Sequence, residues 1–235
     1  MKVIIAIIKF LSKLFLIYSA FAVFITLFFR FIPPPVSAFI YSENVDPFFG
    51  IFKSGDIRQE FTPIDNISRN AVLAVVASED QLFFEHFGFD FQQIEKAMKE
   101  NERRKRIRGA STISMQTAKN LFLWPGKNFI RKGFEAYYTV VLELFWSKKR
   151  IVEVYLNIAE MGKEIYGVGA ASKLYFNKPP SKLSMTEAAS LAAVLPNPKR
   201  RDPRKPSSYL LKRRGQIVEQ MNLIGGVKML DEYLN

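Results

Sequence analysis

The segment SEDQLFFEHFGFD, residues 78–90, directly follows the apolar run AVLAVVA, residues 71–77. The run has too little polarity to lie on a surface, so it predicts a largely buried helix, from about residue 68 to residue 82, that carries Glu79 and Asp80 near its end. We expect the phenylalanines that follow to face these carboxylates. Burial raises a carboxyl pKa and nearby cations lower it, so Glu79 is a candidate general base. On spacing alone, a salt bridge at a helix end is the commoner explanation.

The composition excludes several kinds of chemistry. The chain has 235 residues, enough for one domain or for one domain with an appendage. It contains no cysteine and a single histidine, His86, which excludes disulfides, thiolate zinc sites, cysteine nucleophiles and multi-histidine metal sites. A serine triad would need His86, and no GxSxG-type elbow accompanies it, so serine hydrolysis is a weak proposal.

The N-terminus predicts a membrane anchor. Between Lys13 and Arg30 there are 16 consecutive uncharged residues, and with their flanks they reach the roughly 20 residues that a bilayer demands. A cleaved signal peptide is the alternative, but the apolar run is long for one and no small-x-small cleavage site precedes the prolines. Lys2, Lys9 and Lys13 precede the span, so the positive-inside rule places the N-terminus in the cytoplasm and residues beyond Pro33 outside.

The rest of the chain is basic. Beyond residue 32 there are 30 Lys and Arg residues against 22 Asp and Glu residues, a formal charge of +8. Anionic partners are therefore expected, and an anchored external domain meets lipid head groups and diphosphates rather than nucleic acid. Two runs, at residues 103–108 and 199–205, concentrate this charge, although each alone is usually a solvated or membrane-facing stretch.

The segment from residue 33 to residue 65 has weak signals, and we expect at most short strands near the membrane. Beyond it the sequence predicts a mainly helical domain without internal repeats. Asp90 with Gln93 and Ser184 with Glu187 resemble capping boxes. Further helices are expected over residues 128–146, 147–159 and 167–176, and one from residue 184 to about residue 195.

The stretch RGASTISMQTAKN, residues 108–120, places small residues and hydroxyls before a helix that carries Gln116 and Lys119. A loop that enters a helix offers free backbone N–H groups and a favourable dipole to an anion. Lys119 lies two turns after Ser111 and Thr112, so its ammonium group can approach the same anion. An ordinary Ser/Thr helix cap explains the string at least as well.

The stretch KNFIRKGFE, residues 127–135, puts three cations and a carboxylate on the first turns of one helix. Arg131 and Glu135 are four residues apart, and a surface ion pair worth a few tenths of a kcal/mol is the default interpretation. The alternative is a clamp for a diphosphate with a second carboxylate beside it.

Five ordered blocks within residues 68–193 resemble glycosyltransferase family 51, the peptidoglycan glycosyltransferases, and specifically its monofunctional members. The blocks are EDQLFFEHFGFD, GASTISMQTAKN, RKGFE, KRIVEVYLNIAEMG and YGVGAASKLYFNKPPSKLSMTEAASLA. Ala110, Ser114 and Met115 depart from the commonest form of the second block, GGSTITQQ. So many long blocks in order are a specific signal.

The resemblance implies a lysozyme-like, two-lobed helical domain with a single N-terminal transmembrane helix. Residues 1–32 would be the cytoplasmic tip and anchor, residues 33–65 a juxtamembrane linker, and residues 66–235 the glycosyltransferase domain. The implied reaction polymerises lipid II into glycan strands and releases a polyprenyl diphosphate. The implied location is a bacterial inner membrane, with the catalytic domain in the periplasm. The implied partners are lipid II, the growing glycan strand, membrane phospholipids and other cell-wall synthesis proteins, with no nucleic acid.

The resemblance also assigns roles to residues. Glu79 matches the catalytic base, which takes the proton of the attacking sugar hydroxyl, and Glu135 matches the second catalytic glutamate. The matches to the family's substrate-binding residues are the polar Ser111 and Gln116 and the cations Lys119, Lys127 and Lys132. At Lys127 the family commonly has arginine, which binds phosphate with a bidentate geometry that lysine lacks.

Other residues of the blocks are expected to support the site. We interpret His86 as orienting, Asp80 as local support, and Glu153, Asn157 and Glu160 as structural. No cofactor is required, no metal site is predicted, and a divalent cation such as Mg²⁺ that bridges Glu135 and the diphosphate is compatible with the sequence.

Two alternatives stay open. A lysozyme-like muramidase shares the helical fold and a catalytic glutamate, but its leaving group is a neutral sugar that needs no row of cations. A noncatalytic wall-assembly scaffold explains the anchor and the charge, but it needs neither the buried glutamate nor the hydroxyl-rich loop.

Overall fold

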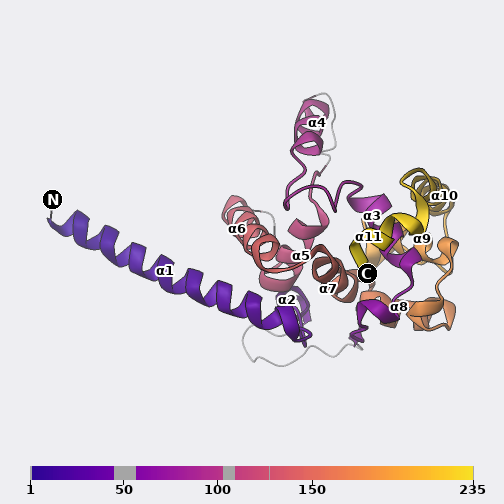
Figure 1. The fold of residues 1–235 in the computed structure, drawn as a ribbon, viewed down its shortest axis with the longest axis horizontal. Helices are drawn as coiled ribbons and strands as arrows, with labels where there is room; N and C mark the ends of the chain where they lie inside the picture. Colours follow the sequence, from indigo (N-terminus) through magenta and orange to yellow (C-terminus); the bar gives the residue numbers. More distant parts are fainter. Residues whose placement is uncertain (1, 45–56, 103–108, 127, 235) are drawn as a thin grey trace.

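The computed structural model describes residues 2–44, 57–102, 109–126 and 128–234 (Figure 1). The α-helices are α1 (Lys2–Phe31), α2 (Ala38–Asn44), α3 (Arg69–Glu79), α4 (Phe91–Asn101), α5 (Ile113–Phe122), α6 (Phe129–Phe145), α7 (Lys148–Ile158), α8 (Gly167–Phe176), α9 (Met185–Val194), α10 (Ser208–Leu223) and α11 (Asp231–Leu234). Short 3-10 helices are η1 (Ile64–Asn66), η2 (Pro180–Lys182), η3 (Pro198–Arg200) and η4 (Gly226–Leu230). The strands are β1 (Arg58–Gln59), β2 (Glu160–Gly162) and β3 (Ile165–Tyr166).

Helix α1 extends away from the rest of the molecule and is the one helix in the described ranges that is long and apolar enough to cross a membrane (Figure 1). Its C-terminal half packs against α6, where the ring centroids of Tyr18 and Phe134 are 5.6 Å apart. Trp146 Nε1 donates a hydrogen bond to the Thr26 carbonyl at 2.8 Å, and the Arg150 guanidinium donates to the Phe29 carbonyl. The C-terminal half of α1 is therefore fixed to the rest of the molecule through α6 and the start of α7.

Helix α3 is the centre of one lobe. Ser68 caps its first turn, and residues 71–77 are all buried, as the apolar run predicts. The helix packs against α9 and α10, whose alanine, leucine and isoleucine side chains share its core. The helix ends at Glu79, three residues earlier than expected, because the backbone of Asp80 leaves the helical region with φ −163° and ψ 81°.

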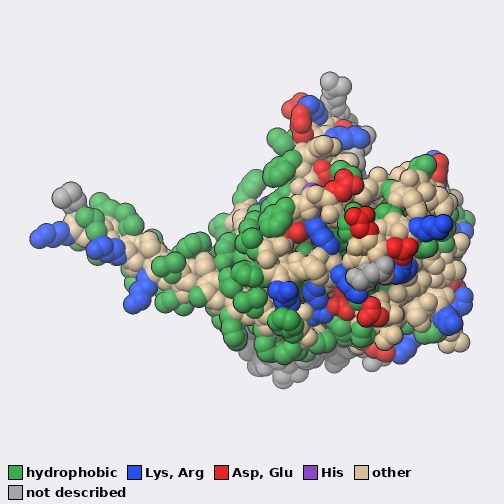
Figure 2. All heavy atoms as spheres, in the orientation of Figure 1, with side chains coloured by type: hydrophobic (Ala, Val, Ile, Leu, Met, Phe, Trp, Pro, Cys, Tyr) green, Lys and Arg blue, Asp and Glu red, His purple; other side chains and the backbone are tan. Residues whose placement is uncertain are grey.

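The second lobe consists of α5 and α6 together with α1 and α2. Helix α5 packs against α6, α7 and α2. Helix α7 in turn packs against α8, and α8 contacts α9 of the first lobe. The mainly helical, two-lobed fold with one N-terminal membrane helix is confirmed. Figure 2 shows hydrophobic side chains gathered along α1 and over the adjoining part of the domain.

The three strands form one small sheet in the order β1-β3-β2, with β1 parallel to β3 and β2 antiparallel to it. Buried Asn157 holds the segment after β1, since its Oδ1 accepts from Thr62 N at 2.6 Å and its Nδ2 donates to Thr62 O at 2.9 Å. Glu153 Oε1 accepts from Ile64 N at 2.8 Å. These contacts agree with the structural role expected of both residues.

Local caps set most helix boundaries as expected. Ser184 and Glu187 form a complete capping box, and the side chains of Asn128 and Ser147 accept from the first turns of α6 and α7. Asp90 accepts from Gln93 N at 2.8 Å. Helices α2, α10 and α11 were not predicted from the sequence. Within the described part of residues 33–65, where at most short strands were expected, the structure has α2, the two-residue β1 and the start of η1.

Candidate active site

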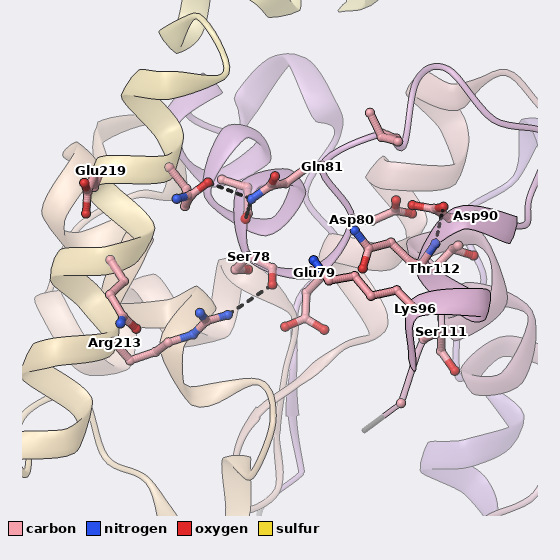
Figure 3. Close-up of a pocket in the computed structure, with 17 residues that line it drawn as sticks. Ser78, Glu79, Asp80, Gln81, Asp90, Lys96, Ser111, Thr112, Arg213 and Glu219 are labelled. Carbon is pink, nitrogen blue, oxygen red and sulfur yellow. Dashed lines mark hydrogen bonds between the residues drawn. The ribbon is translucent and has the colours of Figure 1, made fainter. Parts of the chain in front are cut away.

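Glu79 lies at the last residue of α3 and lines a pocket of about 700 Å³ (Figure 3). Burial raises the pKa of its carboxyl group, whereas a hydrogen bond from Gln116 and the charges of Arg213 and Lys119 oppose that rise. Gln116 Nε2 donates to Glu79 Oε2 at 3.0 Å. Glu79 is thus a partly desolvated carboxylate with one open pocket beside it, as a general base requires.

The phenylalanines of residues 83–91 do not surround Glu79, contrary to expectation. The described lining of its pocket contains none of them. Phe83 is fully buried in the core, and Phe84 stacks on Tyr233 with centroids 4.2 Å apart. The burial of Glu79 comes instead from tertiary packing, since α3 packs against α9 and α10 and the Gln116 side chain reaches the carboxylate from α5. The local sequence does not reveal these contacts.

Asp80 and His86 hold the loop beside Glu79. Asp80 Oδ1 lies 2.9 Å from His86 Nε2, and Asp80 Oδ2 accepts from Ile113 N at 2.9 Å. Asp80 therefore joins the end of α3 to the start of α5. These contacts agree with the supporting roles expected of Asp80 and His86.

The residues before α5 form an ordinary Ser/Thr helix cap, one of the two interpretations of this stretch in the sequence. Thr112 Oγ1 accepts from Met115 N at 3.2 Å and donates to the Gly88 carbonyl at 2.6 Å. Because the amides of Ile113 and Met115 are bonded to Asp80 and Thr112, they are not free for an anion. Ser111, just before the cap, is exposed.

A second pocket, of about 230 Å³, lies beside the first and is rich in cations. Its described lining consists of Phe39, Ser111, Gln116, Lys119, Trp124, Pro125, Gly126, Arg131, Lys132 and Glu135. Burial lowers the pKa of Lys119, while the carboxylate of Glu135 raises it. Three cations thus surround a space of the size of a small anionic group.

Glu135 is the anionic member of this pocket and is almost fully buried. Its Oε2 accepts from Arg131 Nη1 at 2.8 Å, and its Oε1 accepts from Lys132 Nζ. Lys132 Nζ also lies 3.5 Å from Ser111 Oγ. The ion pair expected between Arg131 and Glu135 forms, but it is buried rather than on the surface, so truncating one partner would leave an uncompensated charge.

Seven residues were predicted for the site, and five of them lie together in the lining of the cationic pocket: Ser111, Gln116, Lys119, Lys132 and Glu135. The sixth, Glu79, is joined to them through Gln116, and Ser111 lines both pockets. Lys127, the seventh, lies outside the described residues.

Two further cations belong to the site. Arg131, one of the three cations in the stretch at residues 127–135, lines the cationic pocket, and Arg213 on α10, outside the sequence blocks, lines the Glu79 pocket. The dipeptide Arg213–Arg214 within a basic run is the only local sign of the second. Among the described residues, no group of three or more His, Asp or Glu side chains is placed to hold a metal ion.

Residues 49–222 match the family model described as "Transglycosylase". The chain is 51% identical over 215 residues to a protein of Pasteurella multocida named biosynthetic peptidoglycan transglycosylase. The matched region covers 89% of this chain and 87% of the relative. Proteins with the same name from Bacteroides thetaiotaomicron and Haemophilus influenzae are 50% identical over 221 residues (93% and 88% covered) and 52% identical over 208 residues (87% and 84% covered).

Proposed function

The chain belongs to the transglycosylase family, and we propose that it polymerises lipid II into glycan strands, releasing a polyprenyl diphosphate at each addition. The observation that carries this proposal is the junction of the two pockets. Ser111 lines both, so a carboxylate suited to accept a proton stands next to a cluster of cations suited to hold a diphosphate.

In the proposed reaction, Glu79 is the general base. A sugar hydroxyl has too high a pKa to attack unaided, so Glu79 takes its proton as the oxygen bonds to the anomeric carbon of the donor. The pocket of about 700 Å³ leaves room for the attacking sugar at this carboxylate. Gln116 fixes one oxygen of Glu79 and leaves the other for the proton.

The bond between the anomeric carbon and the diphosphate breaks in the same step, and the electron pair leaves with the diphosphate. Lys119 and Lys132 are aimed at this leaving group, and Ser111 and Gln116 are polar contacts to it. Buried Glu135 holds Arg131 and Lys132 in place through ion pairs. Lys127 keeps its proposed role as a further donor-site cation.

The cationic pocket favours the polymerase over the muramidase. Hydrolysis of a finished strand releases a neutral sugar, so the reaction would not require the positive charges of Lys119, Arg131 and Lys132. A scaffold without catalysis would have no need for a desolvated carboxylate beside an open pocket.

We assign the anchor to a bacterial inner membrane, with the N-terminus cytoplasmic, the catalytic domain (residues 66–235) periplasmic and residues 33–65 as the linker. Support comes from Lys2, Lys9 and Lys13 before the span. Exposed apolar side chains on α6, including Phe129 and Ile130, stand on the helix that packs against α1 and are placed to contact phospholipids.

The proposed reaction requires no cofactor. A Mg²⁺ ion that bridged Glu135 and the diphosphate would compete with Arg131 and Lys132 for the two carboxylate oxygens that they already occupy. The cations can balance the diphosphate charge, so polymerisation should persist after treatment with EDTA.

The deciding experiment gives the detergent-solubilised full-length protein labelled lipid II in one reaction and finished glycan strands in another. Gel and thin-layer analysis should show polymer plus free polyprenyl diphosphate from lipid II, and unchanged strands. Cleavage of the finished strands with lipid II untouched would overturn the polymerase in favour of the muramidase.

A further inference from the structure

Helix α10 forms one wall of the Glu79 pocket, although it lies outside the five sequence blocks. Figure 3 shows Arg213 reaching from this helix toward Ser78 and Glu79, on the side away from Ser111 and Lys96. The half-buried guanidinium Nη2 donates to the Ser78 carbonyl at 3.1 Å. Gln81 Nε2 donates to Gln220 Oε1 at 2.9 Å and joins the same two segments a second time.

The contact has two physical consequences. The Ser78 carbonyl belongs to the last turn of α3, where carbonyls lack helical partners and carry partial negative charge. An arginine bonded there satisfies the carbonyl and fixes the backbone immediately before Glu79. It also places a permanent positive charge next to a carboxylate that burial drives toward its neutral form.

Among the described residues, four charged or titratable groups interact electrostatically with the Glu79 carboxylate. Asp80 follows it in the chain, Lys119 approaches from α5, Tyr155 is buried on α7, and Arg213 comes from α10. Lys119 belongs to the cationic pocket, where its ammonium group would interact with a bound diphosphate. Arg213 does not line the cationic pocket, and it is held near Glu79 by the Ser78 carbonyl, so its position does not depend on a bound sugar donor.

We propose that Arg213 is a positioning residue for the base, which holds the last turn of α3 in place and keeps Glu79 ionised while the acceptor sugar binds. This rests on the proposed function of Glu79. The guanidinium transfers no proton, since it stays charged throughout. It acts by favouring the carboxylate before proton transfer and by easing release of the proton to water afterwards.

The test is the pH dependence of kcat/KM for lipid II polymerisation in the full-length protein. Arg213→Gln removes the charge, Arg213→Met keeps the apolar stem, and Arg213→Lys keeps the charge. Lys212→Gln is the matched control, because Lys212 is exposed on the same helix and does not belong to the pocket lining.

In both neutral variants the acid limb of the profile should move to higher pH by about half a unit to one unit, the shift expected when one partly exposed charge near a carboxylate is lost. Activity should fall several-fold near neutral pH and recover at alkaline pH. Arg213→Lys and Lys212→Gln should keep the wild-type limb.

An unchanged acid limb, or an equal loss at every pH, would overturn the role of Arg213. So would failure of both neutral variants to fold in a thermal-melt assay, since Arg213 would then be a structural link between α3 and α10. Failure of the proposed function is seen separately: Glu79→Gln would polymerise lipid II, or the wild-type protein would not.

Discussion

Gln116 Nε2 and Glu79 Oε2 lie 3.0 Å apart, and this hydrogen bond joins the pocket of the candidate base to the pocket of cations. Tyr155 Oη donates to Gln116 Oε1 at 3.4 Å from the opposite side. The phenol fixes the amide so that its NH₂ group faces the carboxylate. In the proposed reaction, this hydrogen bond holds the proton acceptor and the binding site of the leaving group in one geometry.

Replacing Glu79 by glutamine should abolish polymerisation, because the amide keeps the shape but cannot accept the proton. Binding of a diphosphate-bearing inhibitor should persist. Glu85→Gln, an exposed carboxylate six residues away, is the control and should keep wild-type activity. Turnover of Glu79→Gln within threefold of the wild-type rate would exclude Glu79 as the base.

Because burial raises the pKa of Glu79, the stability of the folded protein should depend on pH through this group. The unfolded carboxyl ionises at its ordinary pKa and the folded one only at a higher pH, so the folded state loses stability as the pH rises from the unfolded pKa through the folded pKa. Glu79→Gln should therefore melt at the same or a higher temperature than wild type at neutral pH, and any gain should vanish in acid. A lower melting temperature at neutral pH would contradict this account.

Lys119→Ala and Lys132→Ala should each reduce kcat on the order of tenfold to a thousandfold, as when one donor to a developing anion is lost. Added salt should weaken binding of a diphosphate-bearing inhibitor to the wild-type protein more than to these variants. Lys212→Ala, on the exposed side of α10, serves as the control. Equal salt dependence in all four proteins would argue against a diphosphate in the cationic pocket.

Removing residues 1–32 should leave both pockets but lower the melting temperature in detergent, because Trp146 Nε1 and the Arg150 guanidinium lose their carbonyl acceptors at the C-terminal end of α1 and at Ile32. Polymerisation of lipid II in detergent should continue. In the full-length protein, Trp146→Phe removes one of these donors alone and should cost about 1 kcal/mol. A truncated protein that melts like the full-length one would show that α1 adds nothing to the outer domain.

Two glycines test the backbone geometry of the fold. Gly167 has φ +80°, and a Cβ there would lie 2.6 Å from the Asn157 carbonyl oxygen, so Gly167→Ala should lower the free energy of unfolding by more than about 1 kcal/mol. Gly215 lies within α10 with open space around it, so Gly215→Ala should raise that energy by about 0.5–1 kcal/mol. Urea unfolding of both variants measures the difference, and equal effects would contradict the geometry at Gly167.

Most of the fold was predictable because its signals are local. The side chains of Ser68, Asn128, Ser147 and Ser184 each accept from a backbone amide two or three residues later, so a helix start is determined within one turn. The anchor is likewise evident from apolar length alone. Helix α10 was missed because its basic face at residues 212–214 resembles a solvated charge run.

The sequence by itself determined most of the helices, the anchor, the family resemblance and the residue types of the site, since each depends on neighbours in the chain or on a motif. Only the tertiary structure decided what surrounds Glu79. Gln116 is 37 positions away from it, and Arg213 is 135 positions away from the Ser78 carbonyl that it binds. Such contacts exist because α3 packs against α9 and α10 and because the Gln116 side chain reaches Glu79 from α5. No local pattern encodes that proximity, and it is the packing that removes water from the carboxylate and brings a cation beside it.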